Sequence, residues 1–322
     1  MLNQFLSLLP FQTFLSRYLF YFNFFPFPSV SHYVRIGELN ASPCHLQKQP
    51  SIGVINMDSK ILFFDIDGTI LSHRNSKILD STKSAIRKAR ENGHFTFINT
   101  GRTISEIDDE IKNVGFDGFV CGCGTYISLH DEVLLHQSLT SEFCKEIVSD
   151  AHAFGIQTVM EGTDTIYFDN HYDHPKLIEL RDRFINHYHF NCSTTDDPNI
   201  LFDKFCLWVS DSADIQSFIQ KYENCFDFID RDNSLFLEVI PKGFSKASGI
   251  EYLLTHLNIP HENAYALGDS ANDLSMLNYV KHSIGMGNSE EEVMKVVSFV
   301  TKDVDEHGVE HALAHFKIIT VL

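Results

Sequence analysis

Two aspartates stand one residue apart at the end of an apolar run, in the stretch Lys60-Ile-Leu-Phe-Phe-Asp65-Ile-Asp67-Gly-Thr69. The run from residue 61 to 64 predicts a strand that is buried on both faces. Carboxylates at the end of such a strand are unfavourable unless something pairs with them. In open α/β sheets ligands bind beyond the carboxyl ends of the strands, where two carboxylates indicate a divalent cation and acid–base chemistry. The alternative is an Asx-turn that only closes the strand.

Two further predicted strands end in polar residues. The first is followed by Thr100-Gly101-Arg102, and the second by Gly268-Asp269-Ser-Ala-Asn272-Asp273. Helix capping explains some of these side chains, but it does not explain four aspartates at one sheet edge, which would repel one another without a cation. Carboxylates, a carbonyl and water are the ligands that Mg²⁺ prefers. A hydroxyl, backbone amides and a lysine, at Thr100, Gly101 and Lys246, would let the site hold a phosphoryl group.

The elements that must position these residues alternate regularly from Met57 onward. Strands are predicted near residues 61–64, 94–99, 119–121, 265–267 and 283–286, and helices near 81–92, 104–113, 246–258, 290–297 and 309–316. This alternation predicts an α/β fold with a doubly wound, Rossmann-like parallel sheet. Right-handed crossovers then bring the polar strand ends to one edge.

The pattern changes between about residues 139 and 241. Short alternating strands are predicted near 157–160, 165–168, 205–210 and 235–240, with helices near 141–154, 175–187 and 213–222. This pattern predicts a separate antiparallel α+β domain that interrupts the sheet. We therefore divide the chain into a core formed by 57–138 and 242–322, and an inserted domain at 139–241.

Residues 1–56 differ from the rest of the chain. Eight phenylalanines fall within the first 28 residues, where Arg17 is the only charge. Prolines and polar residues leave no clean apolar span of about 20 residues, and no basic region precedes the apolar run. The segment could be a signal or anchor, a partner-binding extension, or non-native sequence ahead of an initiator at Met57. We favour the last reading and expect 1–56 to be poorly ordered and without a role in the chemistry.

Composition restricts the partners. A formal net charge of −18 with no basic stretch argues against nucleic acid or an anionic membrane. Seven scattered cysteines without a CxxC pair favour reduced thiols and a cytoplasmic protein. We expect a small-molecule partner, and the sequence leaves the oligomeric state open.

Together, these motifs resemble the haloacid dehalogenase (HAD) superfamily of phosphohydrolases, specifically its Cof-type branch with a type IIB cap. The resemblance runs from Lys60 to the C-terminus, and four motifs occur in the family's order: Asp65-Ile-Asp67-Gly-Thr69, Thr100-Gly-Arg, Lys246 in Lys242-Gly-Phe-Ser-Lys246, and Gly268-Asp269-Ser-Ala-Asn272-Asp273. Gly285-Met-Gly287-Asn288 looks like a C-terminal signature of the family. One departure is Cys121-Gly-Cys-Gly124, where the branch often has Asn-Gly-Ala, and this puts contacts with the substrate in doubt. We interpret Cys121 as a small buried thiol rather than a reactive one.

The resemblance implies a role for each motif residue. Asp65 would attack phosphorus and form an aspartyl-phosphate, and Asp67 would act as general acid and then base. Mg²⁺ would be bound by Asp65, the backbone carbonyl of Asp67 and Asp269, while Asn272 and Asp273 would serve as further ligands or support the ligands. The phosphoryl oxygens would be held by Thr100, Gly101 and Lys246. The alternative for Lys246 is a solvated lysine in a first helical turn, where the helix dipole disfavours a cation without an anionic partner.

The expected function is a Mg²⁺-dependent phosphatase of small phosphomonoesters, such as sugar phosphates or phosphorylated cofactors, with the inserted domain as a cap that closes over the site. We assign no specificity determinant among the polar residues of the cap, which include Glu161, Asp164, Lys204 and Glu238. A phosphomutase is an alternative and would need the aspartyl-phosphate to be protected from water. A non-catalytic regulatory or binding protein on the same scaffold would be expected to lack the nucleophile, a metal carboxylate or the lysine.

Overall fold

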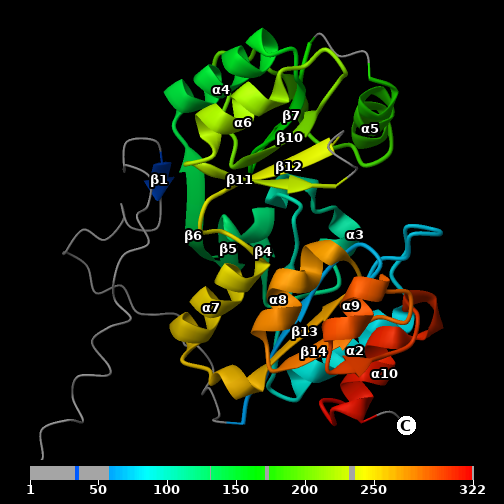
Figure 1. The fold of residues 1–322 in the computed structure, drawn as a ribbon. Helices are drawn as coiled ribbons and strands as arrows, with labels where there is room; N and C mark the ends of the chain where they lie inside the picture. The colour runs from blue at the N-terminus through cyan, green and yellow to red at the C-terminus, as the bar shows by residue number, and fades with distance from the viewer. Residues whose placement is uncertain (1–32, 36–57, 131, 171–173, 232–235, 321–322) are drawn as a thin grey trace, which may run out of the picture.

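The protein forms two sheets, one above the other in Figure 1, in a computed structural model that describes residues 33–35, 58–130, 132–170, 174–231 and 236–320. The expectation for residues 1–56 falls outside this range except at 33–35. These three residues form β1 (Tyr33–Arg35), which pairs with the edge of the larger sheet and was not expected from the sequence.

The larger, nine-stranded sheet belongs to the core and carries the polar strand ends. Its strand order is β1-β6-β5-β4-β3-β2-β13-β14-β15. The parallel part consists of β4 (Gly118–Cys121), β3 (Phe95–Asn99), β2 (Ile61–Phe64), β13 (Ala264–Gly268), β14 (His282–Gly285) and β15 (Phe299–Val300). The predicted parallel sheet is confirmed.

An antiparallel extension of this sheet was not expected. After β4 only residues 122–125 precede β5 (Tyr126–Leu129), which is too short for a crossover helix, so the chain turns back. The next strand, β6 (Glu132–Leu139), pairs with β5 and runs up toward the cap (Figure 1).

Helices cover both faces of the core sheet. On one face lie α2 (Asp80–Glu91), α3 (Asp109–Lys112) and α10 (Gly308–His315), and on the other α7 (Lys246–Leu257), α8 (Leu274–Tyr279) and α9 (Glu291–Val296). Leu62 and Phe64 of β2 pack on the first side, and Ile61 and Phe63 on the second. Burial on both faces is therefore why β2 is a continuous apolar run.

The prediction of one helix over 104–113 is wrong. A short 3₁₀ turn, Ile104–Glu106, is separated from α3 by a non-helical link. The Glu106 carboxylate turns back to accept from the amide of Thr103 (2.7 Å), and Asp108 begins α3 by accepting from the amide of Ile111 (3.0 Å). Two capping side chains therefore divide the segment.

The cap is a six-stranded sheet in the order β11-β12-β10-β7-β8-β9, antiparallel except between β8 and β9. Its strands are β7 (Gln157–Glu161), β8 (Ile166–Phe168), β9 (Cys192–Thr194), β10 (Lys204–Trp208), β11 (Phe226–Asp230) and β12 (Phe236–Pro241). One face is covered by α4 (Ser141–Ala153) and α6 (Ile215–Tyr222), and α5 (Pro175–Asn186) packs on the other. The α+β character expected of this region is confirmed, although β9 and β11 were not expected.

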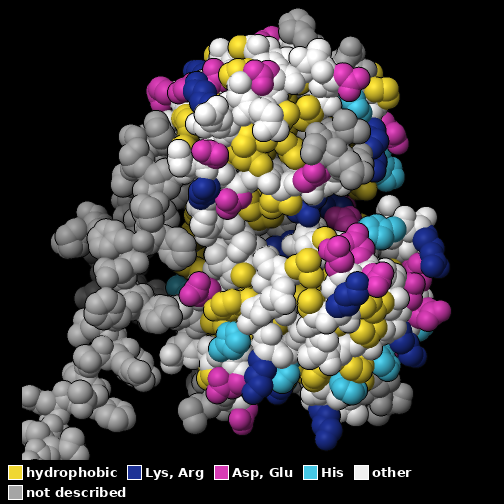
Figure 2. Space-filling model, in the orientation of Figure 1, with side chains coloured by type: hydrophobic (Ala, Val, Ile, Leu, Met, Phe, Trp, Pro, Cys, Tyr) yellow, Lys and Arg dark blue, Asp and Glu magenta, His cyan; other side chains and the backbone are white. Residues whose placement is uncertain are grey.

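The chain passes between core and cap twice. It leaves the core sheet at the end of β6, and it returns between the end of β12 and the start of α7. We propose that the domain boundaries lie at these crossings, near 138/139 and 241/242. Figure 2 shows a hollow between the two parts in which basic and acidic side chains meet. No helix in the described part of the chain is long and apolar enough to cross a bilayer.

Candidate active site

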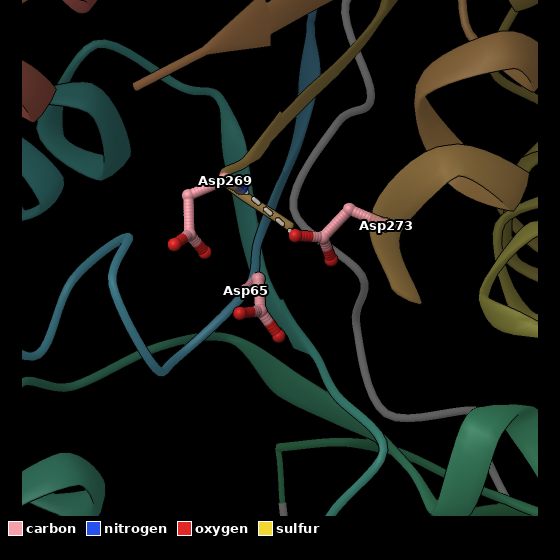
Figure 3. Close-up of side chains that lie close together, drawn as sticks. All are labelled: Asp65, Asp269 and Asp273. Atoms are coloured by element: carbon pink, nitrogen blue, oxygen red, sulfur yellow. Dashed lines mark hydrogen bonds between the residues drawn. The ribbon is translucent and has the colours of Figure 1, made fainter. Parts of the chain in front are cut away.

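Three buried carboxylates converge at the edge of the core sheet (Figure 3). Oxygens of Asp65, Asp269 and Asp273 lie within 4.8 Å of one another. Asp65 directly follows β2 and Asp269 directly follows β13, and these strands are parallel neighbours with Phe64 opposite Leu267. Three of the four aspartates that were predicted to converge therefore lie together, Asp273 coming from the turn before α8, and the side chain of the fourth, Asp67, is not in the cluster.

Lys246 joins two of these carboxylates. It is the first residue of α7 and is 1 % exposed, and its Nζ donates to Oδ1 of Asp65 (2.7 Å) and to Oδ1 of Asp273 (2.6 Å). Burial alone would lower the pKa of Lys246, but Asp273 and Asp65 raise it above its usual range. Lys246 is therefore a buried, charged group and not a solvated lysine of a first helical turn.

Three ionised carboxylates in this cluster would exceed the positive charge beside them. Burial and then Asp273 raise the pKa of Asp65 well above its usual range, with Lys246 opposing the shift. Burial and then Asp273 also raise the pKa of Asp269 to about 7. One contacting ammonium cannot neutralise three carboxylates, and an excess of oxygen donors in a small buried space fits a hard divalent cation such as Mg²⁺.

Asp67 has surroundings different from those of Asp65. Its side chain is 46 % exposed and lies outside the three-carboxylate cluster. Arg102 holds it in a bidentate pair, with Nε to Oδ2 at 2.9 Å and Nη2 to Oδ1 at 2.5 Å. The two aspartates of the first motif thus differ sharply in exposure and partner, as different chemical roles would require.

The turn after Asp67 needs glycine. Gly68 has a φ of +78°, and a Cβ there would lie 2.1 Å from Oδ2 of Asp269. Its carbonyl accepts from Nδ2 of Asn288 at 2.8 Å, and Oδ1 of Asn288 accepts from the amide of Val304 at 2.9 Å. Asn288 therefore fixes the loop that presents Asp67, a positioning role that the C-terminal signature alone did not reveal.

The second motif offers donors on the same edge. Thr100 is buried at the end of β3 and uses its amide in a bond to Val120 (2.9 Å), while its Oγ1 accepts from the amide of Arg102 (3.2 Å). Among the described residues no acceptor takes the proton of this hydroxyl, which can therefore be donated to a ligand. Among the described residues no protein acceptor takes the amide of Gly101, which is the second donor.

The fourth motif is held by its own side chains. Oδ2 of Asp273 accepts from the amides of Asp269 (2.9 Å) and Ser270 (3.2 Å), so Asp273 fixes the loop that carries Asp269. Oδ1 of Asn272 accepts from the hydroxyl of Ser270 at 2.8 Å. Asp273 thus both contacts Lys246 and supports its neighbour.

The cap presents charged residues toward the core. Lys204 is buried and pairs with Glu161 and with Oε1 of Glu238 (3.0 Å), and Arg231 donates from Nη2 to Oε2 of Glu238 at 2.6 Å. The Cys123 thiol of the core lies 3.7 Å from Oε1 of Glu238. Three of the four polar cap residues singled out in the sequence therefore form one network, and Asp164 is exposed. Cys121 is buried, as predicted, and burial raises the pKa of its thiol, which disfavours the reactive thiolate.

Glu106, beside this network, should make stability depend on pH. Burial and then the charge of Glu161 raise its pKa to about 7 from 4.5. Between these values the folded chain holds a proton that the unfolded chain has lost, so folding stability decreases as the pH rises. Glu106→Gln removes this titration. The free energy of unfolding of the variant, relative to that of wild type, should therefore rise with pH by up to about 1.4 kcal/mol per pH unit between about pH 5 and 7.

Denaturant unfolding at several pH values measures this difference. The exposed Glu223→Gln is the matched control and should keep a constant difference from wild type. A flat difference for Glu106→Gln as well would show that the Glu106 carboxyl titrates in its ordinary range.

Comparison with known proteins identifies the family. The sequence profile of the haloacid dehalogenase-like hydrolases matches residues 62–313. YkrA of Bacillus subtilis (strain 168), which bears the provisional name of a phosphatase, is 29 % identical over 82 % of this chain and 100 % of its own. A crystal structure of a hypothetical protein from Geobacillus kaustophilus HTA426 is 30 % identical, covering 81 % of this chain and 100 % of its own with a TM-score of 0.70.

A structure described as the HAD subclass IIB sugar phosphatase BT4131 is 25 % identical, covers 81 % of this chain and 100 % of its own, and has a TM-score of 0.67. The profile spans both halves of the core and the cap between them, and the structural relatives share that arrangement. The chain therefore belongs to the haloacid dehalogenase-like hydrolases, in the Cof-type branch with a type IIB cap.

Proposed function

We propose that this protein is a Mg²⁺-dependent phosphatase that hydrolyses small phosphomonoesters through an aspartyl-phosphate on Asp65. The observation that carries the proposal is the buried cluster of Asp65, Asp269 and Asp273 with Lys246 bonded to two of them. Relatives named as phosphatases add support.

The covalent step belongs to Asp65. Its carboxylate attacks phosphorus, an O–P bond forms, and the leaving oxygen departs on the opposite side. The phosphoryl oxygens receive the hydroxyl of Thr100, the amide of Gly101 and Lys246. Two of the three ammonium protons of Lys246 are engaged by Asp65 and Asp273, so one remains for a phosphoryl oxygen.

Proton transfer belongs to Asp67. It protonates the leaving oxygen and then takes a proton from the water that hydrolyses the aspartyl-phosphate. Its partial exposure lets it exchange protons with solvent, and the bidentate pair with Arg102 keeps it in one orientation. Arg102 is a positioning residue in this scheme.

The cation would be held by the carboxylates of Asp65 and Asp269 and by the backbone carbonyl of Asp67, with Asp273 and Asn272 as further ligands or supports. When bound, Mg²⁺ supplies charge neutralisation that lets a carboxylate approach an anionic phosphoryl group. The presence of Asp65, the other carboxylates and Lys246 argues against a non-catalytic role, in which one of them would be expected to be missing.

Removal of metal tests the proposal. The purified protein, assayed with a panel of phosphomonoesters, should release inorganic phosphate in the presence of Mg²⁺. In EDTA the rate should be lower by at least about 10²-fold. Excess Mg²⁺ should restore it. An undiminished rate in EDTA contradicts the proposal, and so does the absence of hydrolysis for every ester. Transfer of phosphate to a second hydroxyl of the same sugar, instead of its release, would identify a phosphomutase.

A further inference from the structure

A cavity of about 350 Å³ opens beside Asp67, between core and cap. The core contributes Asp67, Arg102 and the loop after β2, and the cap contributes the end of α5 and the residues that follow it. Figure 1 shows α5 on the same side of the molecule as the loop after β2. A leaving group whose oxygen is protonated by Asp67 must lie next to that side chain, so this cavity is where it would extend. Its size suits a small molecule and not a polymer.

The cap side of the cavity is aromatic. Tyr188 and Phe190 stack with ring centres 5.1 Å apart and an interplanar angle of 8°, and Phe184 meets Phe190 edge-on at 5.3 Å. Phe184 is buried in the small core beneath α5, whereas Tyr188 and Phe190 remain partly exposed where they line the cavity. Partly exposed, mutually stacked rings beside a cavity offer a surface on which a flat ring can pack.

Among the described residues that line the cavity, Arg183 is a cation without an acidic partner. Arg102 is neutralised by Asp67, and His73 lies 3.7 Å from Oδ2 of Asp269. Glu106, the other carboxyl on the lining, is engaged by Thr103. Arg183 is exposed and, within the described residues, has no carboxylate at ion-pair distance. A guanidinium in this position suits a planar anion such as a carboxylate or a phosphate.

We infer that this cavity selects phosphomonoesters whose leaving group carries a flat ring and a second anionic group. Tyr188 and Phe190 bind the ring, and Arg183 is the specificity-determining residue that binds the anion. The inference rests on the proposed function, because it places the leaving group by its distance from Asp67. Phosphates of neutral sugars lack both features, so Tyr188, Phe190 and Arg183 would add little to their binding affinity.

Binding of three phosphonates in the presence of Mg²⁺ tests the inference without turnover. They are ethylphosphonate, benzylphosphonate and 4-carboxybenzylphosphonate, measured by calorimetry. Wild type should bind them with affinity increasing in that order. Arg183→Ala should weaken the binding of 4-carboxybenzylphosphonate by about tenfold or more and change the affinity for benzylphosphonate by no more than about twofold. Tyr188→Ser should weaken the binding of both aromatic compounds by about tenfold and leave the affinity for ethylphosphonate unchanged.

Arg87→Ala, which removes an exposed arginine from α2, is the matched control and should change none of the three affinities. Equal effects of Arg183→Ala on all three compounds, or no effect on any, would overturn the inference. Hydrolysis of phenyl phosphate by wild type is measured alongside. Hydrolysis without selective binding refutes the inference alone, and selective binding without hydrolysis of any ester refutes the proposed function.

Discussion

Asp65→Asn is expected to abolish phosphate release, with kcat reduced by at least about 10³-fold. Asparagine keeps the shape of the side chain but cannot form the acyl-phosphate bond, so only catalysis by the remaining groups survives. The metal-free variant should be at least as stable as wild type. The raised pKa of Asp65 means that its charged form is disfavoured in the folded state, and the substitution removes that charge.

Two measurements check this expectation together. Phosphate release under Mg²⁺ gives the activity, and denaturant unfolding in EDTA gives the stability. Asp211→Asn, an exposed position on the cap, is the matched control and should retain wild-type activity. Full Mg²⁺-dependent hydrolysis by Asp65→Asn would rule out Asp65 as the nucleophile. Loss of both activity and folding would instead give the carboxylate a structural role.

Lys246→Met is expected to damage both folding and activity. The methionine has a similar length but leaves Asp65 and Asp273 buried without their ammonium, and breaking a buried pair in this way costs about 3–5 kcal/mol. Activity should fall at least about 10²-fold even where the variant is folded, because one donor to the phosphoryl oxygens is lost. Unfolding curves and assays at low temperature separate the two effects.

A double variant distinguishes charge balance from catalysis. Lys246→Met with Asp273→Asn removes one charge of each sign, so the metal-free protein should regain part of the lost stability. Its activity should stay as low as that of Lys246→Met. Recovery of activity in the double variant would mean that Lys246 serves only to neutralise Asp273.

The site could be predicted to a large extent from sequence because its signals are local. Polar residues that interrupt an apolar strand at its end mark a sheet edge, and the right-handed crossover brings such ends together. The pairing of β2 with β13 does this for Asp65 and Asp269. The difference in surroundings between Asp65 and Asp67 does not follow from their spacing, since residues two apart on an extended strand share a face. It depends on the pair between Asp67 and Arg102, which lies 35 residues away in the sequence.

Features that depend on distant contacts were missed. The hairpin of β5 and β6 has no helical or glycine-rich signal that separates it from a loop. The break at Glu106 was missed for a different reason, because it is local: side chains three residues from their partners cap the segment in competition with the helix. The positions of Arg183, Tyr188 and Phe190 beside the cavity depend on how α5 is placed over the core. Their spacing in the sequence does not predict that they line a cavity.

The position of β2 has a consequence for biosynthesis. Its two neighbours in the sheet are β3, the next strand, and β13, about two hundred residues later in the chain. The cap strands are made in between as one continuous segment, so the cap sheet can fold on the ribosome while β2 has β3 but not yet β13 beside it. Pairing across such a sequence separation is slow, and an exposed apolar strand is prone to aggregation while it waits. Lys246, Asp269 and Asp273 all follow the cap in the sequence. The buried cluster around Asp65 therefore cannot form until the whole cap has been made, so pairing of β2 with β13 also assembles the cluster.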